Sequence, residues 1–172
     1  VMSHANLINL VDWAADRFLI TSEDTLTNVN PIYFDNSVFD LYASLFNGAK
    51  LAPFRADQTK DPQNLVRLVS QVGCTIWFSV PSLLVYLLTT RSVAKDSLSA
   101  IRAFIFGGEG FPKTKLRQLH ELVGHHAVLE NVYGPTECTC ICSARTVSTE
   151  DLASDDNLAP LGYLNPNFEG IV

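Results

Sequence analysis

The sequence predicts an α/β protein: a single subdomain with one mostly parallel, doubly wound sheet and helices on both faces. Short apolar runs alternate along the chain with segments whose apolar residues recur at helical spacing. Within each run consecutive residues are apolar, as in strands that are covered on both faces. Strands that alternate with helices in this way form parallel sheets, because each helix carries the chain back to the start of the next strand.

The first half of the chain opens with an amphipathic helix at 3–20, for which Ser3 is a candidate N-cap. A β-rich run at 25–34 predicts a strand. A helix at 35–46 follows, and the Asn-Gly pair directly after it favours its end. A short strand is expected at 50–54.

The second half continues the alternation. Pro62, which is suited to a first helical turn, opens a helix at 62–71. The remaining elements expected are a strand at 75–80, a helix at 81–90, a strand at 103–106, a helix at 112–123, a strand at 127–132 and a further strand at 138–147.

Composition and charge exclude several classes of protein. The 172 residues are 47% hydrophobic and 17% charged, which is a globular composition and not a disordered one. The net charge of −6 argues against a nucleic-acid partner, because phosphate binding needs clustered Lys and Arg. The most apolar stretch, 75–88, is too short to span a membrane and contains Pro81. Four cysteines without a secretory signal indicate reduced thiols and a cytoplasmic protein.

Three predicted loops lie where ligands bind in parallel sheets, at the carboxyl ends of the strands. They are the Phe-Asp step at 34–35, the GGEG segment at 107–110 and the YGPTE segment at 133–137. Each carries glycine or an acidic residue at the point where the chain leaves a strand.

The YGPTE segment has the parts of a nucleotide site. Tyr133 can stack on a base, and the Gly-Pro pair forms a tight turn that exposes backbone amides. The Thr136 hydroxyl can donate to phosphate, and the Glu137 carboxylate suits Mg²⁺, which prefers oxygen ligands. On the residues alone, a strand-end turn with capping Thr and Glu side chains explains the segment equally well.

The other two loops have weaker signals. Glycines at 107–110 allow a ligand to approach the backbone, but the segment lacks the spacing of a phosphate-binding loop, so a simple turn is favoured. Asp35 fits either a helix cap or an anion that receives a ligand ammonium group. Cys138, Cys140 and Cys142 would share one face of a strand; their spacing favours core or pocket lining over a metal site.

Together these segments resemble the adenylate-forming superfamily, and most of all amino-acid adenylation domains of nonribosomal peptide synthetases and D-alanine–carrier-protein ligases. The matching segments occur in the expected order along nearly the whole chain. They are the FDNSVFD segment at 34–40, the FGGE loop at 106–109, the NVYGPTE motif at 131–137 and PLGY at 160–163.

The resemblance implies a reaction and its cofactors. A carboxylate would attack the α-phosphate of ATP with Mg²⁺ present, giving an acyl-adenylate and pyrophosphate. The acyl group would then pass to the phosphopantetheine thiol of a carrier protein. Such catalysis depends on positioning and on stabilisation of developing charge.

By position in the motifs, the resemblance assigns a role to each residue of the nucleotide site. Tyr133 would stack on adenine and Asn131 would contact its amino group, while Gly108 and Glu109 would flank the ring. Thr136 would contact the α-phosphate, and Glu137 would bind Mg²⁺.

The resemblance assigns Asp35 to the substrate α-amino group, which favours an amino acid over an aryl or fatty acid. Space at Gly107 argues against strict selectivity for alanine. The side-chain pocket is expected among Asn36, Phe39, Ser82, Ile105, Gly107, Val132, Cys140 and Ile141.

Several family parts are missing from the 172 residues: the Gly-rich phosphate loop, the ribose-binding aspartate and the small C-terminal domain with its catalytic lysine. We therefore expect residues 1–172 to be a flavodoxin-like, substrate-binding subdomain of a larger adenylation domain, inactive without the remainder. The alternatives are part of an acyl- or aryl-CoA ligase, which Asp35 disfavours, and a non-catalytic nucleotide-binding module.

Overall fold

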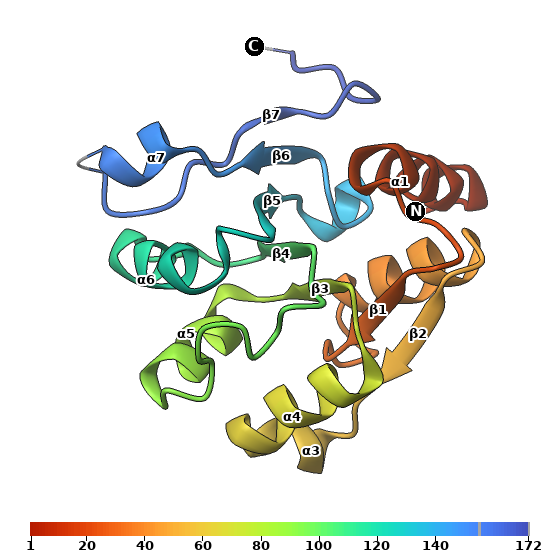
Figure 1. The fold of residues 1–172 in the computed structure, drawn as a ribbon. Helices are drawn as coiled ribbons and strands as arrows, with labels where there is room; N and C mark the ends of the chain where they lie inside the picture. The colour runs from red at the N-terminus through yellow and green to blue at the C-terminus, as the bar shows by residue number, and fades with distance from the viewer. Residues whose placement is uncertain (155, 172) are drawn as a thin grey trace.

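The predicted fold class is confirmed by a computed structural model, which describes residues 1–154 and 156–171 (Figure 1). One seven-stranded sheet has the strand order β2-β1-β3-β4-β5-β6-β7. The first five strands of that order are parallel, and β6 and β7 are antiparallel additions at one edge. The strands are β1 (Thr25–Asn28), β2 (Lys50–Pro53), β3 (Ile76–Ser79), β4 (Ala103–Gly107), β5 (Val128–Tyr133), β6 (Ser143–Thr146) and β7 (Tyr163–Leu164).

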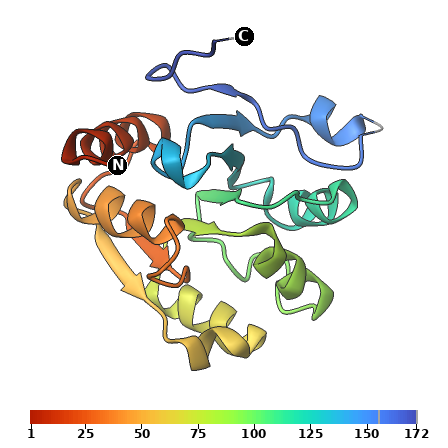
Figure 2. The same ribbon diagram turned by 180° about the vertical axis from the view of Figure 1, so that it is seen from behind.

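Helices cover both faces of the sheet, as Figures 1 and 2 show from opposite sides. One apolar cluster joins α1 and η1 to the sheet, and a second joins α4, α5 and α6 to it. Among the described residues, no helix has the length and apolar character needed to cross a bilayer. The helices are α1 (His4–Phe18), α2 (Asn36–Val38), the π-helix η1 (Phe39–Ala43), α3 (Ala56–Lys60), α4 (Pro62–Val72), α5 (Pro81–Thr89), α6 (Lys113–Val123), the 3-10 helix η2 (Thr136–Cys138) and α7 (Thr149–Ala153).

Helix α1 forms for the reasons that the sequence indicates. Ser3 is its N-cap, and the side chains of Ser3 and Asn6 each accept a hydrogen bond from the other residue's backbone N–H. Buried apolar residues on one face, including Trp13 and Phe18, contact the sheet. The helix ends at Phe18, and its C-cap residue Leu19 has a left-handed φ of 50°.

The strand predicted at 25–34 is too long, because β1 ends at Asn28. Beyond it, Asn30 donates from its side chain to the carbonyl oxygen of Phe78 on β3, at 3.0 Å. Pro31 has no N–H with which to continue a sheet ladder. The result is a loop at 29–35 that leaves the sheet and enters α2.

The prediction of alternating cysteines on one strand face is wrong. Strand β6 begins only at Ser143, and Cys138 belongs to η2. Thr139 and Cys140 have φ values of 62° and 72°, so this backbone is left-handed and not extended. The short elements α3, α7 and β7 were not predicted.

Candidate nucleotide and substrate site

The carboxyl ends of β1, β3, β4 and β5 bring the predicted loops together. The loop that follows β4 lies close to two of the others. A Cβ atom added at Gly108 would lie 3.9 Å from Asn36 Nδ2 and 3.7 Å from Val80 Cγ1. The Cys140 thiol lies 3.9 Å from Asn36 Oδ1. Loops from four parts of the sequence therefore share one edge of the sheet, as the parallel topology requires.

The two glycines of the GGE loop are needed for different reasons. Gly108 has a φ of 89°, a conformation that costs other residues free energy. Gly107 pairs with Val132, and a Cβ there would lie 2.3 Å from the Val132 carbonyl oxygen. The space that the sequence suggests beside Gly107 is therefore occupied by β5. A larger residue at this position would have to move that strand.

Glu109 joins two of the loops. Its Oε2 accepts a hydrogen bond of 3.0 Å from the backbone N–H of Ser82, in the first turn of α5. That helix has Val80 at its N-cap, which offers no side-chain acceptor. Glu109 therefore supplies the missing cap, and its negative charge lies at the positive end of the helix dipole.

The NVYGPTE motif spans the end of β5 and the start of η2. Tyr133 is 45% exposed, so its ring is free for stacking. A Cβ added at Gly134 would lie 2.4 Å from the Cys140 carbonyl oxygen, so only glycine allows these two backbones to pack. Thr136 and Glu137 are exposed. The side chain of Glu137 makes no hydrogen bond or ion pair within 1–154 and 156–171.

Asn131 differs from the other residues of the motif because it is buried. Its Nδ2 donates a hydrogen bond of 2.7 Å to the Pro160 carbonyl oxygen. The PLGY segment is thereby tied to β5. Contact with an adenine amino group, which is a donor, would need the Oδ1 atom of this side chain as acceptor.

A cleft of about 460 Å³ lies beside these loops and contains Asp35, Thr136 and Cys140. Asp35 is half-buried, and its side chain makes no capping hydrogen bond to α2. The helix-cap explanation of this carboxylate is therefore not supported. The other walls of the cleft come from the start of the chain and α1, from α2 and η1, and from the residue after η2: Met2, Ser3, His4, Leu7, Val38, Tyr42 and Thr139.

The predicted side-chain pocket divides into two groups. Asn36 is half-buried and Ser82 is exposed. Cys140 belongs with these two polar residues. Burial raises the pKa of its thiol well above the usual value, and the nearby carboxyl groups of Asp35 and Asp40 add to the effect, so this thiol is neutral. Apart from Gly107, the remaining four form the apolar floor beneath the edge and are at most 2% exposed: Phe39, Ile105, Val132 and Ile141.

Asp40 is a buried polar residue of this region that the sequence-based reasoning missed. It lies inside the FDNSVFD segment, so its sequence position was a signal, but its burial was not foreseen. Its side chain is fully buried and accepts hydrogen bonds from the side chains of Asn28 and Asn30, each at 3.0 Å.

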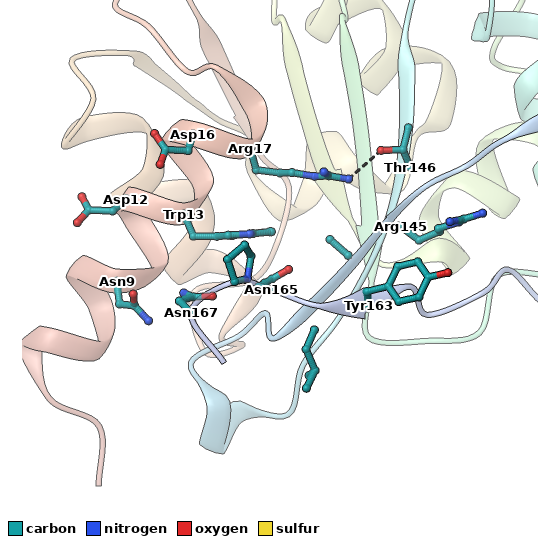
Figure 3. A pocket seen from close by; sticks show the side chains of 13 residues that line it. Asn9, Asp12, Trp13, Asp16, Arg17, Arg145, Thr146, Tyr163, Asn165 and Asn167 are labelled. Atoms are coloured by element: carbon teal, nitrogen blue, oxygen red, sulfur yellow. Dashed lines mark hydrogen bonds between the residues drawn. The ribbon is translucent and has the colours of Figure 1, made fainter. Parts of the chain in front are cut away.

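A larger cleft, of about 640 Å³, lies between α1 and the β6–β7 edge, and no predicted site residue lines it (Figure 3). Arg17 of α1 reaches across to donate to Thr146 Oγ1 at 2.8 Å and to Glu130 Oε1 at 3.1 Å. Arg145 is held by both carboxylate oxygens of Asp151, each at 3.0 Å. Both guanidinium groups are thus already paired.

The described residues contain no group of three or more His, Cys, Asp or Glu side chains that could hold a metal ion.

A family model described as "AMP-binding enzyme" matches residues 1–172. The chain belongs to the AMP-binding enzyme family.

Curated relatives of this AMP-binding chain are carrier-protein ligases. The chain is 36% identical over 151 residues to an L-proline–[L-prolyl-carrier protein] ligase of Streptomyces coelicolor, covering 88% of this chain and 28% of that protein. It is 32% identical over 171 residues to a D-alanine–D-alanyl carrier protein ligase of Bacillus licheniformis, covering 99% and 34%. The chain therefore spans about a third or less of the length of these relatives.

Solved structures agree on the fold of this AMP-binding chain. The crystal structure of IdnL7 superposes with a TM-score of 0.86 at 27% identity, covering 96% of this chain and 34% of that one. The Vibrio cholerae adenylation domain AlmE, in complex with glycyl-adenosine-5'-phosphate, gives a TM-score of 0.83 at 24% identity, covering 94% and 29%. At that identity, the second likeness concerns the fold alone.

Proposed function

We propose that this chain forms the substrate-binding subdomain of a ligase that activates an amino acid. The full enzyme would join the amino acid to AMP with release of pyrophosphate, then transfer the aminoacyl group to the phosphopantetheine thiol of a carrier protein. One observation carries the proposal: Asp35 and Thr136, from loops a hundred residues apart, line the same cleft. The identity of the relatives as amino-acid–carrier-protein ligases supports it.

The Asp35 carboxylate is the group suited to hold the substrate ammonium. It is half-buried and has no hydrogen-bond partner among the described residues, so a ligand cation can use its full acceptor capacity. Ion pairing is stronger where water is partly excluded. This contact would orient the substrate and favour amino acids over other carboxylic acids.

The residues at the end of β5 suit a nucleotide and its metal. Tyr133 is exposed for stacking on adenine, and the hydroxyl of Thr136 can donate to the α-phosphate. The carboxylate of Glu137, which has no partner among the described residues, fits Mg²⁺, which binds proteins through one or two carboxylates and takes its other ligands from phosphate and water. When bound, the ion would neutralise charge on the phosphates.

Glu109 and Gly108 would act through the loop that they shape. Because Glu109 accepts from the Ser82 N–H, it holds the GGE loop against the start of α5. The left-handed Gly108 keeps the backbone beside Asn36 free of a side chain. We propose that this arrangement leaves room for the adenine ring next to the substrate pocket.

The family's Gly-rich phosphate loop and catalytic lysine have no match in residues 1–172. We propose that these parts belong to the remainder of the adenylation domain. We also propose a cytoplasmic enzyme, because ATP and carrier proteins meet in that compartment.

The test is ATP–pyrophosphate exchange by the full-length protein with a panel of amino acids and matched carboxylic acids that lack the amino group. Exchange that depends on one or a few amino acids supports the proposal. Exchange with the non-amino acids instead would identify an acyl- or aryl-CoA ligase and overturn the amino-acid assignment. Residues 1–172 alone should bind weakly and give no exchange; clear exchange by this chain would contradict the subdomain assignment.

A further inference from the structure

Asp40 is a fully buried carboxyl group at the base of the loop that carries Asp35. Its Oδ2 accepts hydrogen bonds from the side-chain amides of Asn28 and Asn30, each at 3.0 Å. Its Oδ1 is buried without a hydrogen-bond partner among the described residues. A buried acid with one unsatisfied oxygen is costly to fold, so its contacts need an explanation beyond packing.

The contacts of Asp40 join three separate parts of the sheet edge. Asn28 is the last residue of β1, and Asn30 lies two residues further along the loop. Asn30 also donates to the carbonyl oxygen of Phe78 on β3, at 3.0 Å, so its amide group bridges η1 and β3. Both ends of the loop at 29–35 are therefore fixed: Asn30 at its start and the helix containing Asp40 at its end.

The helix itself is adapted to bury Asp40. Residues Phe39–Ala43 form a π-helix, whose wider turn places Phe39 and Asp40 side by side in the interior, each 0% exposed. The Ser44 hydroxyl donates to the Asp40 carbonyl oxygen at 2.6 Å, which satisfies a backbone acceptor in this irregular turn. Phe39 packs edge-on against Phe78, with ring centroids 4.9 Å apart.

The other polar contacts of the loop between these anchors are local: the Phe34 N–H donates to the Pro31 carbonyl oxygen at 2.9 Å, and the remaining hydrogen bonds join the loop to the start of α2. From the first turn of α2, the Ser37 hydroxyl donates to the Phe34 carbonyl oxygen at 2.7 Å, which closes the turn around Asp35. The side chains of Ile32, Tyr33 and Phe34 are exposed, so apolar burial fixes the loop only at its first residue, Val29, which packs against the core. The position of the Asp35 carboxylate therefore depends on the polar contacts at the two ends.

We propose that Asp40, with Asn28 and Asn30, is a positioning residue that sets the Asp35 carboxylate at the distance and angle needed for a substrate ammonium group. This inference rests on the proposed function of Asp35. Asp40 itself is buried beneath the site and does not touch substrate. The predicted pocket residue Phe39 lies in the same π-helical turn as Asp40. The contacts of Asp40 therefore also orient one wall of the side-chain pocket.

The neutral form of the acid is suited to this role. Burial raises the pKa of Asp40 to about 8, and the hydrogen bonds from Asn28 and Asn30 lower it only in part. At neutral pH the group is therefore mostly protonated and can still accept both amide hydrogen bonds at Oδ2. An asparagine has the same shape, no charge and a carbonyl oxygen at the same place.

The experiment compares Asp40→Asn and Asp40→Leu in the full-length protein, by ATP–pyrophosphate exchange. Asp40→Leu keeps the branching at Cγ but is bulkier and leaves both amide donors unpaired, so we expect the KM for the amino acid to rise about tenfold or more, because small misplacements of binding groups cost that much. The KM for ATP should stay within about twofold of wild type. Asp40→Asn should restore the amino-acid KM.

Asp24→Asn is the matched control, because Asp24 is also a buried acid but lies at the opposite end of β1, bound to Arg102. It should lower the melting temperature without changing the ratio of the two KM values. If the role of Asp40 is purely structural, Asp40→Leu will behave like Asp24→Asn: less of the enzyme will be folded, but the KM values for the amino acid and for ATP will both be unchanged. That result would overturn the inference.

The two proposals fail in different ways. If the wild-type protein shows no amino-acid-dependent exchange, the proposed function is wrong. If the wild type is active and Asp35→Asn raises the amino-acid KM while Asp40→Leu does not, the function stands and the positioning role of Asp40 is wrong.

Discussion

The Glu109 carboxylate accepts a hydrogen bond of 3.0 Å from the backbone N–H of Ser82, and so it caps a helix twenty-seven residues away in the sequence. The GGE loop and the start of α5 are thereby joined at the edge of the sheet where the candidate site lies. A residue that the family resemblance assigns to the nucleotide thus has a second, structural contact, and the two roles can be separated by experiment.

Glu109→Ala should destabilise the 172-residue chain by about 0.5–1 kcal/mol, because it removes both the cap and the charge at the helix N-terminus. Glu109→Gln should lose less, since its amide oxygen can still accept the hydrogen bond. Urea unfolding followed by circular dichroism measures both. Glu121→Ala, at an exposed position of α6, is the control and should change little. Equal losses for Glu109→Ala and Glu121→Ala would contradict the capping role.

Asp35→Asn should weaken amino-acid binding in the full-length protein and leave ATP binding unchanged. A charge-assisted hydrogen bond contributes about 1.5–3 kcal/mol, which corresponds to a rise of about 10- to 100-fold in the KM for the amino acid. Pyrophosphate exchange at varied amino acid and at varied ATP separates the two values. Asp57→Asn changes an exposed carboxylate paired with Arg55 and should have no effect. A proportional rise in both KM values would count against an ammonium contact.

The sequence predicted well those elements whose causes are local. Helix α1 has its cap and its apolar face within its own residues, and the prediction of a helix at 3–20 required nothing else. Helix α4, with Asp61 as cap and Pro62 in the first turn, is similar. The parallel order of the central strands followed from the alternation of strands and helices, and it correctly brought the glycine-rich and acidic loops to one edge.

Features that depend on distant partners were missed. The end of β1 depends partly on the hydrogen bond from Asn30 to Phe78. The burial of Asp40 depends on its hydrogen bonds from Asn28 and Asn30. The sequence pattern does not show that these residues are partners. The strand expected through Cys140 fails because the backbone must pack against Gly134. Periodicity identifies the side chains that share a face, but it does not report such close approaches between backbones.

Gly134→Ala tests the contact between the nucleotide motif and the cysteine-containing loop. A Cβ at this position would lie 2.4 Å from the Cys140 carbonyl oxygen and 2.7 Å from Ile141 Cα, so backbone must move, at a cost of about 1–3 kcal/mol. Gly110→Ala is the control: its Cβ would meet only the end of the flexible Leu158 side chain, and the loss should be below about 0.5 kcal/mol. Urea unfolding of the 172-residue chain compares them. Indistinguishable midpoints would mean that the close approach does not constrain the fold.

The ion pair between Asp24 and Arg102 predicts loss of stability in acid. Burial alone would raise the pKa of Asp24, but hydrogen bonds from Arg102, Thr75 and the backbone of Thr21, together with the guanidinium charge, hold it below its usual value. A carboxyl group with a lowered folded-state pKa stabilises the protein above its unfolded pKa, near 4, and loses that contribution as the pH falls. The melting temperature of wild type should therefore exceed that of Asp24→Asn at pH 7 by more than at pH 3. A difference that is constant across this range would show that the charge does not contribute.

Asp40 predicts the opposite dependence. Its folded-state pKa is raised to about 8, so folding favours the protonated form. That contribution is fully present below the unfolded pKa, near 4, and is lost as the pH rises towards 8, because the unfolded chain releases its proton first. The stability of wild type relative to Asp40→Asn should accordingly fall between pH 5 and pH 8, measured by urea unfolding at each pH. The cysteine thiols are common to both proteins, so their ionisation cancels in the comparison. A relative stability that rises with pH would mean that Asp40 is ionised in the folded protein and that its two asparagine partners bind a charge.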